Sequence, residues 1–512
     1  MKYTYDVISK IVSYFPIFNY NFRDELLNNI NEEYCFKYLY NIYSLENEYD
    51  LLDNYSDNDS LSDTRVSFND YEKIFYKLII DNTINSHLKD KILLYLKKKE
   101  VDTTQLIKNS YREKEFITNV TIPKGIFKLN KKSFKFCINL KDIKMLEIKE
   151  INYQSFFCCN NLKKIKINNV EIIGYQSFKK CINLKNVIGN NVIKIDAEAF
   201  GYCKFLNSIN FKKLEIIEEE TFSNCIFLKK IYLPKIKILK KYSFLNCSKI
   251  KSIYMKNVEV IESYVFKDCT LLEKVFIPNI KIINDNSFQN CVNLIYLNMK
   301  NIVTIGINTF NYCEKLEKIN MPKVKSIGHS CFINCKNLKK VNISNVEFID
   351  NDVFYNCKKL NELNILHCEQ INNFSFYNCL SLKKLYCPNI KTIGISSFKF
   401  CFNLISIEII NVISIDDNCF DSCKSLINLN CPNIEKIGNE SFKNCLNLEQ
   451  IDISKVFKIG KKCFQNCSSI KLIKIPQEFT TNKEKLRIFD DCVDNIKFIT
   501  TKRSNNIFDY LD

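Results

Sequence analysis

The chain has 512 residues, 46% of them hydrophobic, so it can bury a large core. No window approaches the roughly 18 unbroken apolar residues of a membrane-crossing helix, so no membrane span is expected. The net charge of +17 is uneven: residues 1–115 carry 15 Lys/Arg against 20 Asp/Glu, and the remainder carries 59 against 37. This asymmetry favours acidic partners or contact between the two parts. The alternative is that lysines solvate the outer surface of every repeat.

Residues 1–115 are predicted to form a small α-helical domain that caps the segment after it. Asp6 and Lys10 interrupt the first apolar run, and no small-residue cleavage site follows, so a signal peptide is not expected. Residues 46–63 contain seven acids and no base, which predicts a solvated acidic loop. The expected helices cover about 7–15, 22–43, 70–81, 86–99 and 104–110.

Residues 116–500 are organised by a strict repeat in which phenylalanine precedes cysteine by three positions. Sixteen such units follow one another at a spacing of 22 residues, and a seventeenth, Phe489/Cys492, comes 25 residues later. A fixed period of this length predicts a solenoid of stacked turns. The ruler cysteines are Cys137, Cys159, Cys181, Cys203, Cys225, Cys247, Cys269, Cys291, Cys313, Cys335, Cys357, Cys379, Cys401, Cys423, Cys445 and Cys467.

Each turn is predicted to contain one short strand of a parallel sheet. Apolar residues lie three, six, eight, eleven and fourteen positions after each ruler cysteine, and the L-x-x-I-x-I part alternates as a half-buried strand does. Proline often follows, as at Pro234, and marks the end of the strand. Sixteen rungs would span on the order of 75 Å. Phe489, Cys492, Ile496, Phe498 and Ile499 are expected to make an irregular closing rung before a tail over residues 501–512.

The unit N-C-x-x-L-x-x-I-x-I-P-x-I-x-x-I-G-x-x-S-F, as in Asn378 to Phe398, resembles the BspA-type (Treponema pallidum-type) leucine-rich repeat. The resemblance covers about seven-tenths of the chain. It implies a leucine-rich repeat solenoid, α/β to mainly β, with a parallel concave sheet of about sixteen 22-residue rungs. It further implies a binding or adhesion scaffold, and many members are surface proteins. This chain departs from them because it lacks an obvious export signal.

The cysteines are interpreted as buried free thiols at equivalent core positions. Side chains stacked in parallel seldom reach disulfide geometry. The N-x-S sequences at Asn246 and Asn466 lie beside ruler cysteines, where a glycan would be awkward. We therefore expect an intracellular, cytoplasmic protein. The C-x-x-x-C pairs Cys331/Cys335, Cys419/Cys423 and Cys463/Cys467 have a spacing that zinc ligands can show, but we expect core packing, because the extra cysteine replaces a repeat serine.

No catalytic or nucleotide-binding pattern is present in the sequence. His87, His329 and His367 lie in no recognisable catalytic motif, and neither G-x-x-x-x-G-K-[ST] nor G-x-G-x-x-G occurs. We therefore expect a protein that is not an enzyme and that has no cofactor or metal.

Positions five and seven after the cysteine are expected to point outward from the sheet, because six and eight point inward. Exposed aromatics beside lysines have the composition of protein-binding hot spots. They also suit single-stranded nucleic acid, but no arginine enrichment or nucleic-acid motif supports that choice. A third interpretation is that these aromatics only shield strand edges. The candidate partner-binding residues are Tyr232, Tyr254, Phe276, Tyr296, Lys230, Lys274, Lys318 and Lys340.

Three functions follow from these observations. The preferred one is a non-enzymatic scaffold that binds an acidic protein partner through the concave face. The second is an adhesion or surface protein of the BspA type. The third is an F-box-like substrate receptor of a ubiquitin ligase, suggested by a faint likeness in LKDKILLYL, residues 88–96, which lacks that motif's usual proline.

Overall fold

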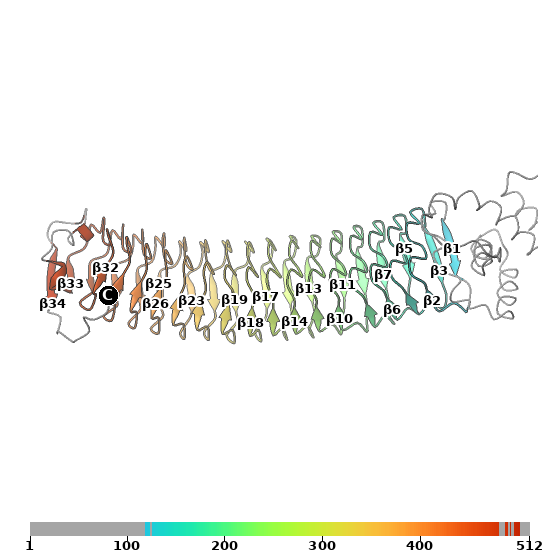
Figure 1. Cartoon of the computed structure of the whole chain (residues 1–512), viewed down its shortest axis with the longest axis horizontal. Helices are drawn as coiled ribbons and strands as arrows, with labels where there is room; N and C mark the ends of the chain where they lie inside the picture. Colours follow the sequence, from blue (N-terminus) through green and yellow to red (C-terminus); the bar gives the residue numbers. More distant parts are fainter. Residues whose placement is uncertain (1–117, 123–124, 481–486, 490–491, 493–495, 502–512) are drawn as a thin grey trace, which may run out of the picture.

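The computed structural model describes residues 118–122, 125–480, 487–489, 492 and 496–501. Over these ranges the chain winds into a parallel β-solenoid of about 17 turns. Figure 1 shows an elongated, gently bowed rod, with successive turns stacked in sequence order. The predicted helical domain with its acidic loop, the F-box-like segment and His87 lie outside the described residues.

Each turn contributes two strands rather than the single strand predicted. A long strand occupies positions 5–7 after the ruler cysteine, and a two-residue short strand occupies positions 13 and 14. The sequence pattern hides the short strand because two residues are too few to show alternation. The chain is thus mainly β: its described helices are two three-residue 3₁₀ turns, η1 (Gln477–Phe479) and η2 (Arg487–Phe489).

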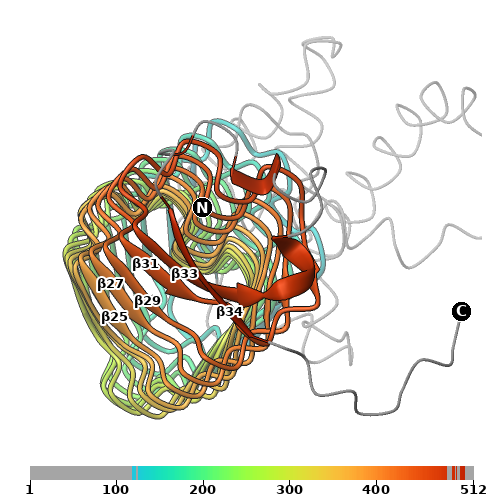
Figure 2. The same ribbon diagram turned by 90° about the vertical axis from the view of Figure 1, so that its left-hand side faces the viewer.

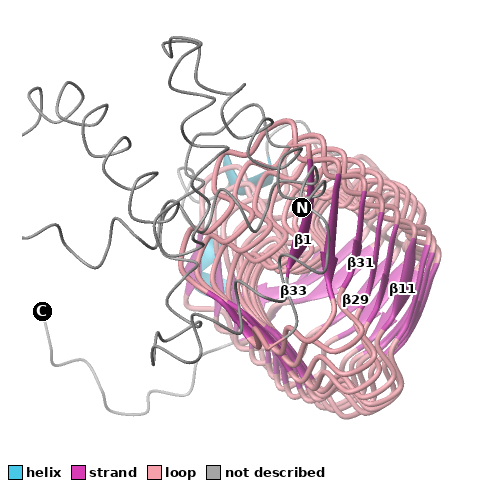
Figure 3. Ribbon diagram, turned by 90° about the vertical axis from the view of Figure 1, so that its right-hand side faces the viewer, coloured by secondary structure: helices cyan, strands magenta, loops and turns pink. Residues whose placement is uncertain are grey.

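The long strands form one wall of the rod, and the wall is seen along the axis in Figures 2 and 3. They are β1 (Asn119–Ile122), β3 (Asp142–Met145), β5 (Lys164–Lys166), β7 (Asn186–Ile188), β9 (Ser208–Asn210), β11 (Lys230–Tyr232), β13 (Ser252–Tyr254), β15 (Lys274–Phe276), β17 (Tyr296–Asn298), β19 (Lys318–Asn320), β21 (Lys340–Asn342), β23 (Glu362–Asn364), β25 (Lys384–Tyr386), β27 (Ser406–Glu408), β29 (Asn428–Asn430), β31 (Gln450–Asp452) and β33 (Leu472–Pro476).

The short strands form a second row. They are β2 (Lys128–Leu129), β4 (Glu150–Ile151), β6 (Ile172–Ile173), β8 (Lys194–Ile195), β10 (Ile216–Ile217), β12 (Ile238–Leu239), β14 (Val260–Ile261), β16 (Ile282–Ile283), β18 (Thr304–Ile305), β20 (Ser326–Ile327), β22 (Phe348–Ile349), β24 (Gln370–Ile371), β26 (Thr392–Ile393), β28 (Ser414–Ile415), β30 (Lys436–Ile437) and β32 (Lys458–Ile459).

Neighbouring turns pair in parallel, with each residue beside its equivalent 22 positions later. Lys164 thus lies opposite Asn186 in the β5–β7 pair. The short row pairs without a break from β10 to β32, whereas the long row is interrupted between β3 and β5, between β11 and β13, between β17 and β19, and between β23 and β25. The register explains why one 22-residue pattern serves every turn, because each side chain lies beside the residue at the same repeat position of the next turn.

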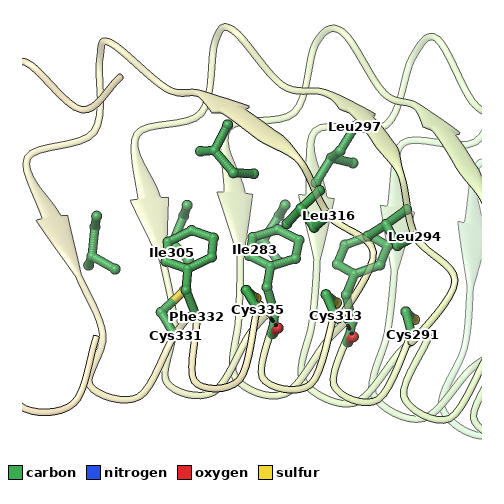
Figure 4. Close-up of a cluster of buried hydrophobic side chains, with 14 of the residues drawn as sticks. Ile283, Cys291, Leu294, Leu297, Ile305, Cys313, Leu316, Cys331, Phe332 and Cys335 are labelled. Atoms are coloured by element: carbon green, nitrogen blue, oxygen red, sulfur yellow. Dashed lines mark hydrogen bonds between the residues drawn. The ribbon is translucent and has the colours of Figure 1, made fainter. Parts of the chain in front are cut away.

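The core is a single column in which equivalent residues stack from turn to turn. The ruler phenylalanines from Phe134 to Phe464, followed by Phe489, form an unbroken series of stacked rings with centroids 5.0–5.5 Å apart. Figure 4 shows part of this core, with Phe332 above Cys331 and the short-strand side chains Ile283 and Ile305 close to the rings. Ring pairs of this kind add to the stabilisation from area burial.

Two residues of each turn adopt the left-handed conformation, five positions and one position before the ruler cysteine. Asparagine is the commonest residue immediately before the cysteine, as at Asn356, where φ is 61°. Asparagine tolerates this conformation better than most residues because its short polar side chain bonds locally. The left-handed backbone at this position therefore explains why asparagine so often precedes the ruler cysteine.

The C-terminal closing rung is confirmed in most of its parts. β34 (Lys497–Thr501) pairs with β33, and Phe498 packs against the core. The Cys492 thiol donates to the Phe464 carbonyl at 2.9 Å, which continues the contact made by the ruler thiols. Ile499 also belongs to β34, where its side chain is 40% exposed on the outward side.

Candidate functional site

The candidate site is the outer surface of the long strands, here called the long-strand face. Positions 5 and 7 point outward and positions 6 and 8 are mostly buried, as the alternation predicts: Lys164 and Lys166 are exposed, whereas Ile165 and Ile167 are buried. Among the predicted aromatics, Tyr254 is 70% exposed, and Tyr232 and Tyr296 are exposed by about half. Phe276 is half-buried.

Three of these aromatics, Tyr232, Tyr254 and Phe276, share position 7 and are called here the aromatic trio. Tyr254 and Phe276 stack face to face, with centroids 4.8 Å apart and an interplanar angle of 4°. This stacking covers part of Phe276 and leaves Tyr254 open on its other side. The break between β11 and β13 separates Tyr232 from the stacked pair.

Tyr296 does not join the aromatic trio. It lies at position 5, opposite Lys274 in the β15–β17 pair, so it belongs to a column of lysines and serines. The spacing in the sequence already places Tyr296 at position 5 and the other three aromatics at position 7, and the strand pairing has the same register.

The four predicted lysines differ in their surroundings. Lys340 forms an ion pair with Glu362 at 2.7 Å, so its charge is partly compensated. Lys230, Lys274 and Lys318 are exposed and make no ion pair within the part of the chain that the structure describes. These three remain available to a partner.

Beyond Phe276, position 7 becomes neutral and polar over four turns. Asn342 donates its side-chain amide to Asn320 at 2.9 Å, and Asn364 donates to Asn342 at 3.4 Å. The run of Asn298, Asn320, Asn342 and Asn364 therefore satisfies part of its own hydrogen bonding from turn to turn. The long-strand face changes character along the rod, from basic and aromatic to amide-rich.

The ruler cysteines occupy the core, as their spacing predicts. From Cys159 to Cys467 each thiol is free and donates to the carbonyl of the ruler phenylalanine in the preceding turn, at 3.0–3.5 Å. Burial raises the pKa of the Cys401 thiol to about 12 and that of Cys357 well above its usual range. Such thiols are inert donors and not nucleophiles.

The additional cysteine of the C-x-x-x-C pairs occupies a buried serine position. Ser177 at the equivalent place donates to the carbonyls of Gly174 and Asn152, at 2.5 and 3.0 Å. Cys331, Cys419 and Cys463 are fully buried there, and burial raises the pKa of Cys331 to about 12. Within the described ranges no three potential ligands from His, Cys, Asp and Glu converge on one point.

Two features of the surface were missed by sequence reasoning. One is a cluster of aromatic rings near the ruler turns: Tyr355 stacks on Tyr377 at 4.7 Å, Tyr377 meets Phe400 edge-on at 5.3 Å, and Phe400 contacts Phe402 at 5.9 Å. Tyr355 and Tyr377 share one repeat position, but Phe400 and Phe402 occupy two others, so no single column of the sequence reveals the cluster. The other is position 4, where exposed lysines directly precede several long strands.

A shallow hollow of about 500 Å³ lies beside the short strands, and its polar groups contact one another. Lys281 and Glu259, both in its lining, form an ion pair at 2.6 Å, and Asn257 donates to the Pro234 carbonyl at 2.8 Å. These contacts leave little unsatisfied chemistry for a ligand.

No helix within the described residues is long and apolar enough to cross a membrane. His329 contacts the hydroxyl of its neighbour Ser330, with Nδ1 and Oγ 2.9 Å apart.

Comparison with known proteins gives a consistent family match. A family model described as BspA type leucine rich repeat region (6 copies) matches residues 104–213, 171–295, 281–405 and 391–511. These matches together cover well over half of the chain. No curated protein matches it.

Among solved structures, a leucine-rich repeat protein from Bacteroides ovatus is 25% identical over 75% of this chain and 92% of its own, with a TM-score of 0.49. A leucine rich cell surface protein from Faecalibacterium prausnitzii is 20% identical over 61% of this chain and 87% of its own, with a TM-score of 0.35. The T. pallidum leucine rich repeat protein is 18% identical over 41% of this chain and 77% of its own, with a TM-score of 0.22.

Proposed function

The chain belongs to the BspA-type leucine-rich repeat family, a repeat scaffold of the protein-interaction or surface kind, and from this we propose that it is a non-enzymatic scaffold for an acidic protein partner. The observation that carries the proposal is the aromatic trio beside unpaired lysines on the long-strand face. Tyr254 is 70% exposed yet held in place by its stack on Phe276. A ring that is already ordered loses little entropy on binding, which is a property of good anchors.

We further propose that the protein acts inside the cell with its thiols reduced. The ruler thiols support this, because each donates to a carbonyl of the preceding turn, a contact that a disulfide would remove. Asn246 and Asn466 also support it, since their side-chain nitrogens donate to Asn224 and Asn444 at 2.9 and 3.0 Å. A glycan on either nitrogen would interrupt these bonds. The alternative is a surface protein, for which a free-thiol count on protein from its native source is decisive.

The first prediction tests the long-strand face. The double variant Tyr254→Ala/Phe276→Ala of the full chain is expected to weaken binding of the native partner at least ten-fold, because it removes the stacked anchor. The partner is captured from native lysate, identified, purified and then titrated by calorimetry. The melting temperature is expected to change little, because both side chains lie on the outer face.

The matched control is Tyr312→Ala/Phe348→Ala, which removes two aromatics that are 46% and 39% exposed away from positions 5 and 7 of the long strands. Equal losses in both variants would contradict the proposed face. A large fall in melting temperature for the first variant would show that its two rings serve the core.

A further inference from the structure

Seven successive turns, those of Cys137 to Cys269, carry a concentration of lysines at positions 4, 5 and 7 of the long-strand face. All ten side chains are exposed, and only Asp142 and Glu273 bring negative charge to the same positions. Within the described part of the chain, none of the ten amino groups makes an ion pair or a hydrogen bond. The lysine track consists of Lys141, Lys144, Lys163, Lys164, Lys166, Lys185, Lys229, Lys230, Lys251 and Lys274.

Elsewhere the same chain neutralises its lysines from turn to turn. At position 12, beside the short strands, opposite charges alternate, and Lys149–Glu171 and Glu215–Lys237 pair at 2.7 and 2.9 Å. On the C-terminal part of the long-strand face several lysines are paired in the same way, as in Asp452–Lys474 at 3.1 Å and Lys340–Glu362 at 2.7 Å, whereas Lys318 is not paired with any of the described residues. A lysine-rich composition alone therefore does not account for the lysine track.

The lysine track is unfavourable to the fold by itself. Lys141, Lys163 and Lys185 occupy position 4 of consecutive turns, and the Lys185 amide donates to the Lys163 carbonyl at 3.1 Å. Turns are about 4.8 Å apart, and like charges on neighbouring strands are destabilising. Uncompensated repulsion on one part of one face is relieved only when negative charge is brought from outside.

We propose that the lysine track binds an extended acidic segment of the protein partner, laid along the axis of the rod. This proposal rests on the proposed function and specifies the partner's chemistry. The aromatic trio lies on the last three turns of the lysine track, and the neutral asparagine run begins one turn beyond. The acidic segment thus lies over the basic turns, with an apolar or aromatic residue at the trio.

The composition of the face favours an acidic peptide over a nucleic acid. No arginine occurs between residues 118 and 480, so the planar, two-pronged contact that suits phosphate is missing. Tyr254 and Phe276 stack on each other, which removes ring surface that a base would need. The lysine ammonium group acts as a point charge, so a carboxylate can approach it from any direction.

The length of the lysine track sets the length of the segment. Seven turns at about 4.8 Å span about 30 Å, which an extended peptide covers with about nine residues at ~3.3 Å each. We expect affinity for oligoglutamate to rise steeply from five to ten residues and to level off by fifteen. It should also fall with added salt, because the contacts are exposed.

The test measures binding of fluorescently labelled oligoglutamates of five, ten and fifteen residues to the full chain by anisotropy. Lys163→Glu/Lys164→Glu/Lys166→Glu is expected to reduce affinity for the ten-residue peptide at least ten-fold. The control is Lys358→Glu/Lys383→Glu/Lys384→Glu, which makes the same charge change on three exposed lysines of the C-terminal turns. We expect at most a two- to three-fold effect from the control.

Equal losses in the two variants would show attraction by net charge alone and would overturn the inference. Tighter binding of a ten-nucleotide oligothymidine than of the ten-residue peptide, lost in the first variant only, would assign the track to nucleic acid instead. Tyr254→Ala/Phe276→Ala is expected to leave oligoglutamate binding within two-fold. Failure of the lysine track and failure of the aromatic anchor are therefore distinguishable.

Discussion

At the scale of single residues, asparagine before the ruler cysteine shows how the backbone selects side chains. Asn356 has a positive φ, donates to Asn334 at 2.5 Å and accepts from Asn378 at 2.9 Å. One residue thus meets a conformational demand within its own turn and links three turns. The sequence displays the recurrence of asparagine, whereas only the structure shows that the cause is a left-handed backbone.

We predict that Asn356→Ala destabilises the protein by about 1–3 kcal/mol, since it places a Cβ without polar support in the left-handed region and removes both side-chain bonds. Asn356→Gly keeps the backbone conformation and loses only the bonds, so its cost is expected to be smaller. Urea unfolding of both variants measures the difference. An alanine variant as stable as the glycine variant would show that the backbone conformation contributes nothing.

At the scale of one turn, the phenylalanine stack is the main contact between neighbouring elements. Phe310 is fully buried between Phe288 and Phe332, with centroids 5.5 and 5.4 Å away. The long row of strands is already interrupted near it, between β17 and β19. At this point the stack, the short strands and the backbone hydrogen bonds of the ruler turns, such as Phe310 N–H to the Cys331 carbonyl at 2.9 Å, join the two parts of the rod.

Phe310→Ala is expected to cost about 3–5 kcal/mol, because it removes a buried ring and leaves a cavity. Since a solenoid's turns contact mainly their neighbours, the single unfolding transition is expected to separate into two. Hydrogen exchange on the two sides of residue 310 reports this separation. Phe348→Ala, which truncates a ring that is 39% exposed, serves as the control and is expected to keep one transition.

At the scale of the whole molecule, the column of buried thiols couples stability to pH. A free thiol in an unfolded chain titrates near pH 9.0, whereas burial raises the pKa of Cys401 to about 12 and those of Cys379 and Cys423 well above 9.0. Raised folded-state pKa values mean that this contribution to stability is complete below pH 9. It is lost as pH rises from 9 toward 12, because the unfolded state then releases protons that the folded state retains.

We predict a steep fall in the free energy of unfolding above pH 9, with each such thiol contributing about 1.4 kcal/mol per pH unit. In the variant Cys379→Val/Cys401→Val/Cys423→Val the free energy of unfolding is expected to fall less steeply with pH than in the parent. The difference in slope corresponds to about three fewer protons released on unfolding. Urea titrations at pH 8, 9 and 10 give both slopes, and lysine and tyrosine contributions cancel in the comparison. Parallel slopes would mean that these thiols do not titrate as burial requires.

Most of the fold was predictable because the repeat records contacts of each turn with its own copies. The 22-residue spacing, the buried phenylalanine and cysteine, and the inward positions 6 and 8 follow from one period and one alternation. The second row of strands was not predictable, since a two-residue strand leaves no periodic mark. The outward direction of Tyr232 and Tyr254 and the position-5 column of Tyr296 could be predicted, but the stacking of Tyr254 on Phe276 could not.

A stack of in-register turns with a basic surface follows from the sequence alone, because the period and the composition are properties of one turn. Which charges are neutralised is visible only once the turns are stacked. Lys281 has a glutamate beside it in the preceding turn, whereas Lys163 has lysines in both neighbouring turns. Such pairings depend on register between turns, and they are what separates a solvated lysine from one that remains available for a partner.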